Sequence, residues 1–321
     1  MTSARFPLAV LPTPLTRLDR LAAALGRGPL WAKRDDLTGF GVAGNKARAL
    51  EHLVGDALAR GADVLVTGGG PDSNFVAAAA LAAAVAGMDC ELVVAGGAHR
   101  TTNLALAADA GAVLHPLDGP REGIDAAVER LAAGLAREGR RPLAVPRGGS
   151  TRVGAAGFAA AAAEVVAQWP EPQPPASVVI PVGSGGSVAG LLAGLAAAGA
   201  DWPVLGVSVS RPPDEITATV LDLAAATAGA PPRADLLTIV DARGPGFGVA
   251  SPADRAAAAL VRRTEGLLLD DTYGAEAAAV LVEHLGTDPR PALFWLTGGI
   301  PSALAHAGEQ AHDEEIRERT P

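Results

Sequence analysis

Ser177-Val-Val-Ile-Pro-Val182 is followed directly by Gly183-Ser-Gly-Gly-Ser187. The first six residues form a mostly apolar run that is typical of a buried strand, and the next five form a glycine-rich turn. The residues that follow are apolar enough for a buried helix, and Gly199 stands where such a helix would end. This order of strand, turn and helix is that of a β-α unit in a parallel sheet.

The same β-α unit recurs on both sides of this segment. Further strands are expected at residues 63–67, 91–95, 113–117, 142–146, 204–210, 267–270 and 293–296. Helices are expected at residues 74–86, 102–110, 123–137 and 151–168, and a proline-rich connection at residues 169–175. The pattern predicts an α/β fold with two open, mostly parallel, twisted sheets that carry helices on both faces.

The composition of the chain excludes several classes of protein. Hydrophobic residues make up 49% and charged residues 19% of the 321 positions, which is typical of a globular protein and not of a disordered one. The net charge of −9 argues against nucleic-acid binding, which needs a basic face. The single cysteine, Cys90, and the lack of a long apolar run indicate a cytoplasmic protein without a membrane partner. No histidine pair has the spacing of metal ligands, so no metal is expected.

A single phosphate is the ligand best suited to the glycine-rich turn, which consists of Gly183, Ser184, Gly185, Gly186 and Ser187. Successive backbone N–H groups and a helix dipole attract an anion, and glycine lets it come close. The sixth position is Val188, so the turn is not a dinucleotide fingerprint, and the chain lacks the Gly-Lys-Ser/Thr of a P-loop. An ordinary tight turn between strand and helix remains the alternative.

Two other helix starts carry polar side chains that could meet a ligand. Ser73 and Asn74 follow the glycines of Thr67-Gly-Gly-Gly-Pro-Asp72, although from the local sequence alone simple capping of the helix explains them better. Lys46 lies in the first turn of a helix that follows a polar, glycine-rich segment. Most lysines are solvated and idle, but burial and the helix dipole would both disfavour its charge and favour a nucleophilic amine.

Taken together, these motifs resemble the D-cysteine desulfhydrase and 1-aminocyclopropane-1-carboxylate deaminase family of fold-type II pyridoxal-phosphate enzymes, whose fold is like that of tryptophan synthase β. The resemblance follows almost the whole chain in order. Its motifs are Leu11-Pro-Thr-Pro-Leu15, Lys33-Arg-Asp-Asp-Leu37, Gly44-Asn-Lys46, Gly69-Gly-Pro-Asp-Ser-Asn74, Gly148-Gly-Ser150, Gly183-Ser-Gly-Gly-Ser187, Asp270-Asp-Thr-Tyr273 and Leu296-Thr-Gly-Gly299. It implies a small domain of residues 46–158, inserted into a large cofactor-binding domain of residues 1–45 and 159–321, and a homodimer.

The resemblance also implies pyridoxal 5'-phosphate as the cofactor and assigns roles around it. Lys46 would bind the cofactor covalently and then move a proton at the substrate Cα. Asn74 would donate a hydrogen bond to the ring oxygen, and the backbone of residues 183–187 would bind the phosphate. Thr297 would face the pyridine nitrogen, where a neutral hydroxyl makes a softer electron sink than a carboxylate.

The substrate side of the site is implied in the same way, and it departs from the family pattern. Ser73 would contact the substrate or share in proton transfer, and Tyr273 would lie near it. Asn74, Phe75 and Phe247 complete the expected substrate-binding set, with Phe247 standing where the deaminases have a second tyrosine. The same comparison finds Asp72, Phe75, Ala77, Ala49 and Gly274 where the family often has other residues.

These departures weaken the case for opening an aminocyclopropane ring and leave simpler proton chemistry at Cα. The sequence therefore predicts a lyase that carries out α,β-elimination and deamination of a small amino acid, similar to D-cysteine desulfhydrase. Alternatives that keep the cofactor are β-replacement, aminocyclopropane-carboxylate deamination, racemisation, or a specialised-pathway reaction on an unusual amino acid. A ligand-binding homologue without turnover is a further alternative. A nicotinamide-dependent dehydrogenase is excluded by the missing fingerprint.

Overall fold

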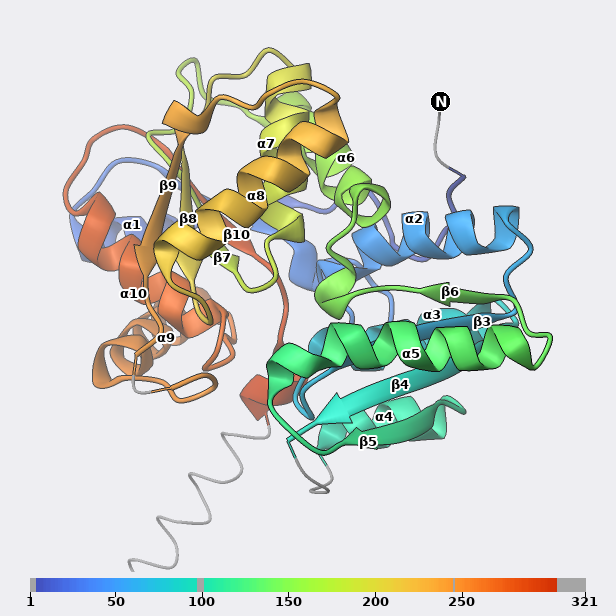
Figure 1. The fold of residues 1–321 in the computed structure, drawn as a ribbon. Coiled ribbons are helices and arrows are strands. Elements are labelled where there is room, and N and C mark those ends of the chain that lie inside the picture. The colour runs from blue at the N-terminus through green and yellow to red at the C-terminus, as the bar shows by residue number, and fades with distance from the viewer. Residues whose placement is uncertain (1–3, 97–100, 245, 305–321) are drawn as a thin grey trace, which may run out of the picture.

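The computed structural model describes residues 4–96, 101–244 and 246–304 and contains two sheets (Figure 1). The larger sheet has the order β1-β2-β10-β7-β8-β9, and the smaller has the order β5-β4-β3-β6. The larger sheet is formed by β1 (Leu15–Arg17), β2 (Leu30–Arg34), β10 (Ala292–Leu296), β7 (Val178–Val182), β8 (Val204–Ser208) and β9 (Leu237–Asp241). The smaller is formed by β5 (Val113–Leu117), β4 (Asp89–Ala95), β3 (Val64–Gly69) and β6 (Pro142–Ala144).

All strand pairs of the two sheets are parallel except β1 with β2. Parallel strands need crossover connections, and helices supply them. The helices are α1 (Asp19–Leu25), α2 (Lys46–Ala59), α3 (Asn74–Val85), α4 (Thr102–Asp109), α5 (Ile124–Arg137), α6 (Arg152–Gln168), α7 (Gly186–Ala197), α8 (Pro213–Ala228), α9 (Pro252–Glu265) and α10 (Gly274–Leu285). Short 3₁₀ turns occur at η1 (Asp35–Leu37), η2 (Arg121–Gly123), η3 (Arg147–Gly149) and η4 (Ala234–Leu236).

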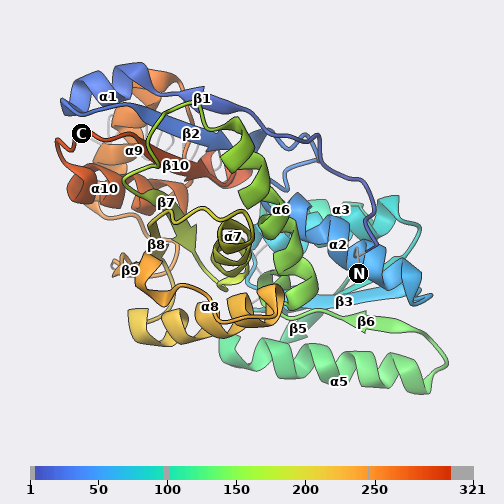
Figure 2. The ribbon, with the colours of Figure 1, turned by 90° about the horizontal axis from the view of Figure 1, so that it is seen from above.

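Helices cover both faces of each sheet (Figures 1 and 2). In the larger sheet, one apolar layer joins the strands to α6, α7 and α8, and the opposite layer joins them to α1, α9 and α10. In the smaller sheet, α2, α3 and α4 pack on one face and α5 on the other. The strands that lie in the middle of the sheets, such as β3 and β7, are buried along their whole length. This is the predicted fold class.

Besides β1 and β9, which were not expected, two regions differ from the sequence-based expectation. Residues 267–270 were expected to be a strand and are not one, because the Asp270 carboxylate bonds backbone N–H groups of the next residues and turns the chain into α10. Conversely, β2 was not expected. It contains Lys33, which is fully buried, so its charge disguised a core strand.

Candidate active site

Lys46 is the first residue of α2 and lies against the end of β10. The preceding loop packs so closely on the residue after β10 that a Cβ atom on Gly44 would be 2.3 Å from the Thr297 carbonyl oxygen. Gly44 also has a φ of +52°, which favours glycine. The next amide, Asn45 N, donates a hydrogen bond of 2.8 Å to the same carbonyl oxygen. The loop therefore fixes where the lysine side chain begins.

The amine of Lys46 has an environment suited to a nucleophile. Its side chain is only partly exposed, and burial lowers its pKa to about 8, against a smaller opposing effect of the Asp270 carboxylate. No ion pair within the described part of the chain includes Lys46. A lysine with such a pKa holds a substantial fraction of free amine near neutral pH.

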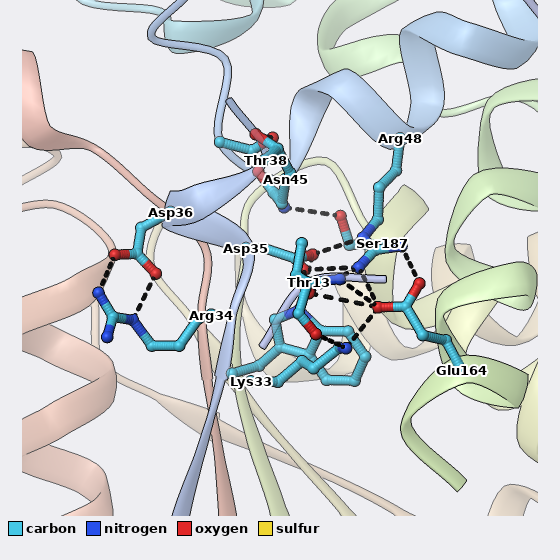
Figure 3. Close-up of polar contacts among 12 residues, drawn as sticks. Thr13, Lys33, Arg34, Asp35, Asp36, Thr38, Asn45, Arg48, Glu164 and Ser187 are labelled. Carbon is cyan, nitrogen blue, oxygen red and sulfur yellow. Dashed lines mark hydrogen bonds and ion pairs between the residues drawn. The ribbon is translucent and has the colours of Figure 1, made fainter. Parts of the chain in front are cut away.

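A buried network of charges holds the first turns of α2 (Figure 3). Arg48 forms a bidentate ion pair with Asp35, with two bonds of 2.8 Å, and also bonds Glu164 of α6 at 3.0 and 3.1 Å. Lys33 bonds Glu164 and, at 2.8 Å, the carbonyl oxygen of Thr13. Two cations thus face two carboxylates, so no net charge is buried. Because Arg48 is two residues after Lys46, the network also anchors the lysine.

Hydrogen bonds from two other segments fix the loop between β7 and α7. Gly185 has a φ of +93° and precedes the first turn of α7. Ser150 Oγ donates to Ser184 Oγ at 2.7 Å and accepts from Gly186 N at 3.1 Å. Asn45 Nδ2 donates to Ser187 Oγ at 3.1 Å, which joins this loop to the residue beside Lys46.

Tyr273 lies next to this loop and to Asp270. A Cβ atom on Gly183 would be 3.2 Å from the tyrosine ring. The Tyr273 amide donates to the Asp270 carboxylate at 3.0 Å, as does the Gly274 amide at 2.9 Å. Burial and the Asp270 charge raise the pKa of Tyr273 to about 12, so its phenol keeps its proton at neutral pH. The ring of Phe247 meets that of Tyr273 edge-on, with centroids 6.2 Å apart.

The predicted site residues at the start of α3 also make contacts that hold the fold. Ser73 caps the helix, and its Oγ accepts from Val76 N at 3.4 Å. Asn74 Oδ1 accepts from Asn103 Nδ2 at 3.1 Å, which orients the amide. Phe75 is buried in the apolar layer under α2, beside Gly149.

Comparisons with known proteins show which family this chain belongs to. Residues 7–298 match the family model described as pyridoxal-phosphate dependent enzyme. The chain belongs to this family. It is 37% identical to the D-cysteine desulfhydrase of Salmonella typhi over 318 residues, which cover 94% of this chain and 97% of the relative.

Solved structures share the fold of this chain. The crystal structure of an ACC deaminase homologue has 32% sequence identity and a TM-score of 0.87, over 96% of this chain and 95% of that chain. A fungal L-serine ammonia-lyase from Rhizomucor miehei shares the fold at 20% identity, with a TM-score of 0.70 over 98% of this chain and 99% of that chain. The predicted family, fold type, cofactor and lyase class are thereby confirmed. No helix in the described ranges is long and apolar enough to cross a membrane.

The residues of this chain fit pyridoxal 5'-phosphate. The first turn of α7 offers N–H groups that have no partner within the helix, at a glycine-lined loop, for the phosphate. Lys46 offers an amine that no carboxylate pairs with in the described structure, and it is one of only two lysines in the sequence. The other, Lys33, is held by the charge network. Of the two lysines, Lys46 is thus the one without a carboxylate partner in the described structure. That it binds the cofactor covalently, and which residues contact the cofactor, stay predictions.

Several residues of this site had no assigned role from the sequence. Asn45, Ser150 and Asp270 each belong to one of the motifs of the family resemblance, so their positions in those motifs could have indicated a role in the site. Arg121, whose guanidinium lies over the Phe247 ring, belongs to no motif, and no sequence pattern indicated this contact because the two residues are far apart in the chain. Glu276 is fully buried, and neither of its carboxylate oxygens has a hydrogen-bond partner within the described residues. Burial, together with the charges of nearby aspartates, raises its pKa to about 9.

Proposed function

We propose that this protein removes the β-substituent and the amino group of a small amino acid, as a lyase of the D-cysteine desulfhydrase type. The observation that supports this most strongly is the unpaired amine of Lys46, with its lowered pKa, beside Asp270 and the residue after β10. For D-cysteine, the overall reaction consumes one water and yields pyruvate, hydrogen sulfide and ammonia. The Cα–H and Cβ–S bonds break, and the sulfur leaves with the electron pair of its bond.

Different residues of the site have different roles in this reaction. When bound, the cofactor withdraws electrons from the substrate Cα, which makes the Cα proton acidic. Lys46 accepts that proton, because a pKa of about 8 lets the amine act as a base at neutral pH. Tyr273 keeps its phenol proton and donates it toward the leaving group. Ser73 and Asn74 would orient the substrate and the cofactor ring, and Thr297 would face the ring nitrogen.

We also propose a domain division, an assembly and a location for this protein. The small domain consists of residues 46–158, which is supported by the position of the smaller sheet within residues 64–144. The protein acts as a homodimer on a small amino acid, and size-exclusion chromatography with light scattering tests its assembly. A cytoplasmic location is supported by the lone, buried Cys90, which suits a reducing compartment.

The decisive experiment uses the two lysines of the chain. The loaded protein is reduced with borohydride and digested, and the cofactor label is expected on Lys46 and not on Lys33. Lys46→Ala is expected to lower the release of pyruvate and ammonia from D-cysteine by at least about a thousandfold. A label on Lys33 would refute the assignment of the amine.

The same assay distinguishes the proposed activity from the alternatives. D-cysteine, β-chloroalanine and aminocyclopropane carboxylate are supplied separately, and sulfide, ammonia and keto acid are measured. Keto acid from the first two substrates alone supports elimination. Keto acid from aminocyclopropane carboxylate would indicate a deaminase, and product that retains its amino group would indicate β-replacement or racemisation.

A further inference from the structure

Arg121 reaches from the smaller sheet toward the substrate side of the site. It is the first residue of η2, the turn that leads into α5. Its guanidinium carbon lies 4.1 Å from the centroid of the Phe247 ring, which belongs to the segment after β9. Phe247 in turn contacts the ring of Tyr273. The arginine therefore lies one aromatic ring away from the tyrosine that we place beside the substrate.

The guanidinium has no carboxylate to pair with in the described structure. Its Nε atom is buried without a hydrogen-bond partner, and no ion pair there includes Arg121. A buried donor without a partner costs free energy, because it has lost its hydrogen bonds to water. Phe247 holds the guanidinium through its ring face but has no oxygen to accept from it. The donors of the arginine are thus left for a ligand.

The neighbours of Arg121 place that ligand in the substrate site. A Cβ atom on Gly70 would be 3.7 Å from the guanidinium, and Gly70 belongs to the loop that carries Ser73 and Asn74. Phe247 also lines a cavity of about 560 Å³ at the ends of β8 and β9. The arginine in that lining, Arg243, is already paired with Asp241 at 2.7 Å, whereas Arg121 reaches the cavity only through its contact with Phe247.

We propose that Arg121 binds a negatively charged group on the β-substituent of the substrate. The substrate class is then small amino acids that carry a second anionic group, such as a carboxylate, sulfonate or phosphate, beyond Cβ. The α-carboxylate has another site available, because the N-terminus of α3 offers backbone N–H groups. This inference rests on the proposed function and narrows its substrate.

The test compares two substrates that differ in the charge of the leaving group. O-phosphoserine and β-chloroalanine are given to the loaded enzyme, each as both enantiomers, and kcat/KM is measured from keto acid release. In Arg121→Met, the ratio of kcat/KM for O-phosphoserine to that for β-chloroalanine is expected to fall about 10- to 100-fold. Arg121→Lys keeps the charge and is expected to recover part of the ratio. Arg130→Met, on the exposed side of α5, is the matched control and should leave the ratio unchanged.

The outcomes separate this inference from the proposed function. An unchanged ratio in Arg121→Met, or a wild-type enzyme that does not favour O-phosphoserine, overturns the anion site while elimination stands. If no substrate is eliminated, binding of aspartate and of alanine to the loaded protein is measured through the absorbance of the cofactor. Tighter binding of aspartate that is lost in Arg121→Met supports the anion site, and equal binding of both overturns it.

Discussion

The two lysines of this chain lie thirteen positions apart and have opposite surroundings. Both are removed from solvent to a large degree, and burial lowers the pKa of both. Lys33 is bonded to a carboxylate, an amide oxygen and a backbone carbonyl, whereas Lys46 has no such partner in the described structure. The pairing of a buried charge, and not burial alone, distinguishes a structural lysine from a reactive one.

The same contrast extends to the regions around the two lysines. Around Lys33, cations and carboxylates satisfy one another (Figure 3). The Trp295 indole N–H also donates to the Asp35 carboxylate, at 2.9 Å. Near Asp270 and Tyr273, on the other side of the site, Glu276 and Arg121 leave buried polar atoms without partners in the described part of the chain. The first region holds the fold, and the second keeps unpaired groups for chemistry.

The largest effect on stability is expected from breaking the paired region. Arg48→Met leaves Asp35 and Glu164 buried without their main cation, so the free energy of unfolding should fall by about 3–5 kcal/mol. Urea unfolding measures this, with Arg130→Met as an exposed control that should change it by less than about 0.5 kcal/mol. A loss in Arg48→Met no larger than that of the control would show that the network does not anchor α2.

A smaller change in the free energy of unfolding, of opposite sign, is expected for Glu276, whose carboxylate oxygens have no partner within the described residues. The pKa of Glu276 is raised to about 9 in the folded protein, so the fold binds a proton that the unfolded chain loses above its ordinary pKa near 4.5. Wild-type stability should therefore fall as the pH rises from about 4.5 to 9. Glu276→Gln removes this dependence. The free energy of unfolding of the variant minus that of the wild type should therefore rise by about 3 kcal/mol between pH 4.5 and pH 7. Thermal unfolding across this pH range checks it, and parallel curves for the two proteins would contradict the assigned pKa.

The smallest effect is expected on cofactor affinity, when the hydrogen-bonded hydroxyl of Ser150 is removed. Ser150→Ala removes the hydroxyl that orients Ser184 and the Gly186 amide, so the loop should bind the cofactor phosphate about fivefold more weakly. Titration of the unloaded protein with pyridoxal phosphate measures the affinity. Ser150→Thr retains the hydroxyl and is the matched variant. Equal affinity of the wild type and Ser150→Ala would remove Ser150 from the phosphate site.

The sequence predicted the elements whose residues follow a simple period and the loops that belong to recognisable motifs. The strand before Gly183 and the helix after Ser73 are found where their patterns place them. Patterns do not report partners, however. Lys33 made β2 look unlike a core strand, because its partner Glu164 is distant in sequence. Arg121 could not be predicted, because only the fold brings it to Phe247.

The tight packing at Gly44 has a practical meaning for anyone who wishes to change what this enzyme accepts. No side chain can be introduced there without moving the backbone after β10, so that position is closed to engineering. The contact of Arg121 with Phe247, in contrast, joins two side chains and involves no backbone. A mutant library aimed at new substrates should therefore keep residue 44 constant and randomise positions 121 and 247 together.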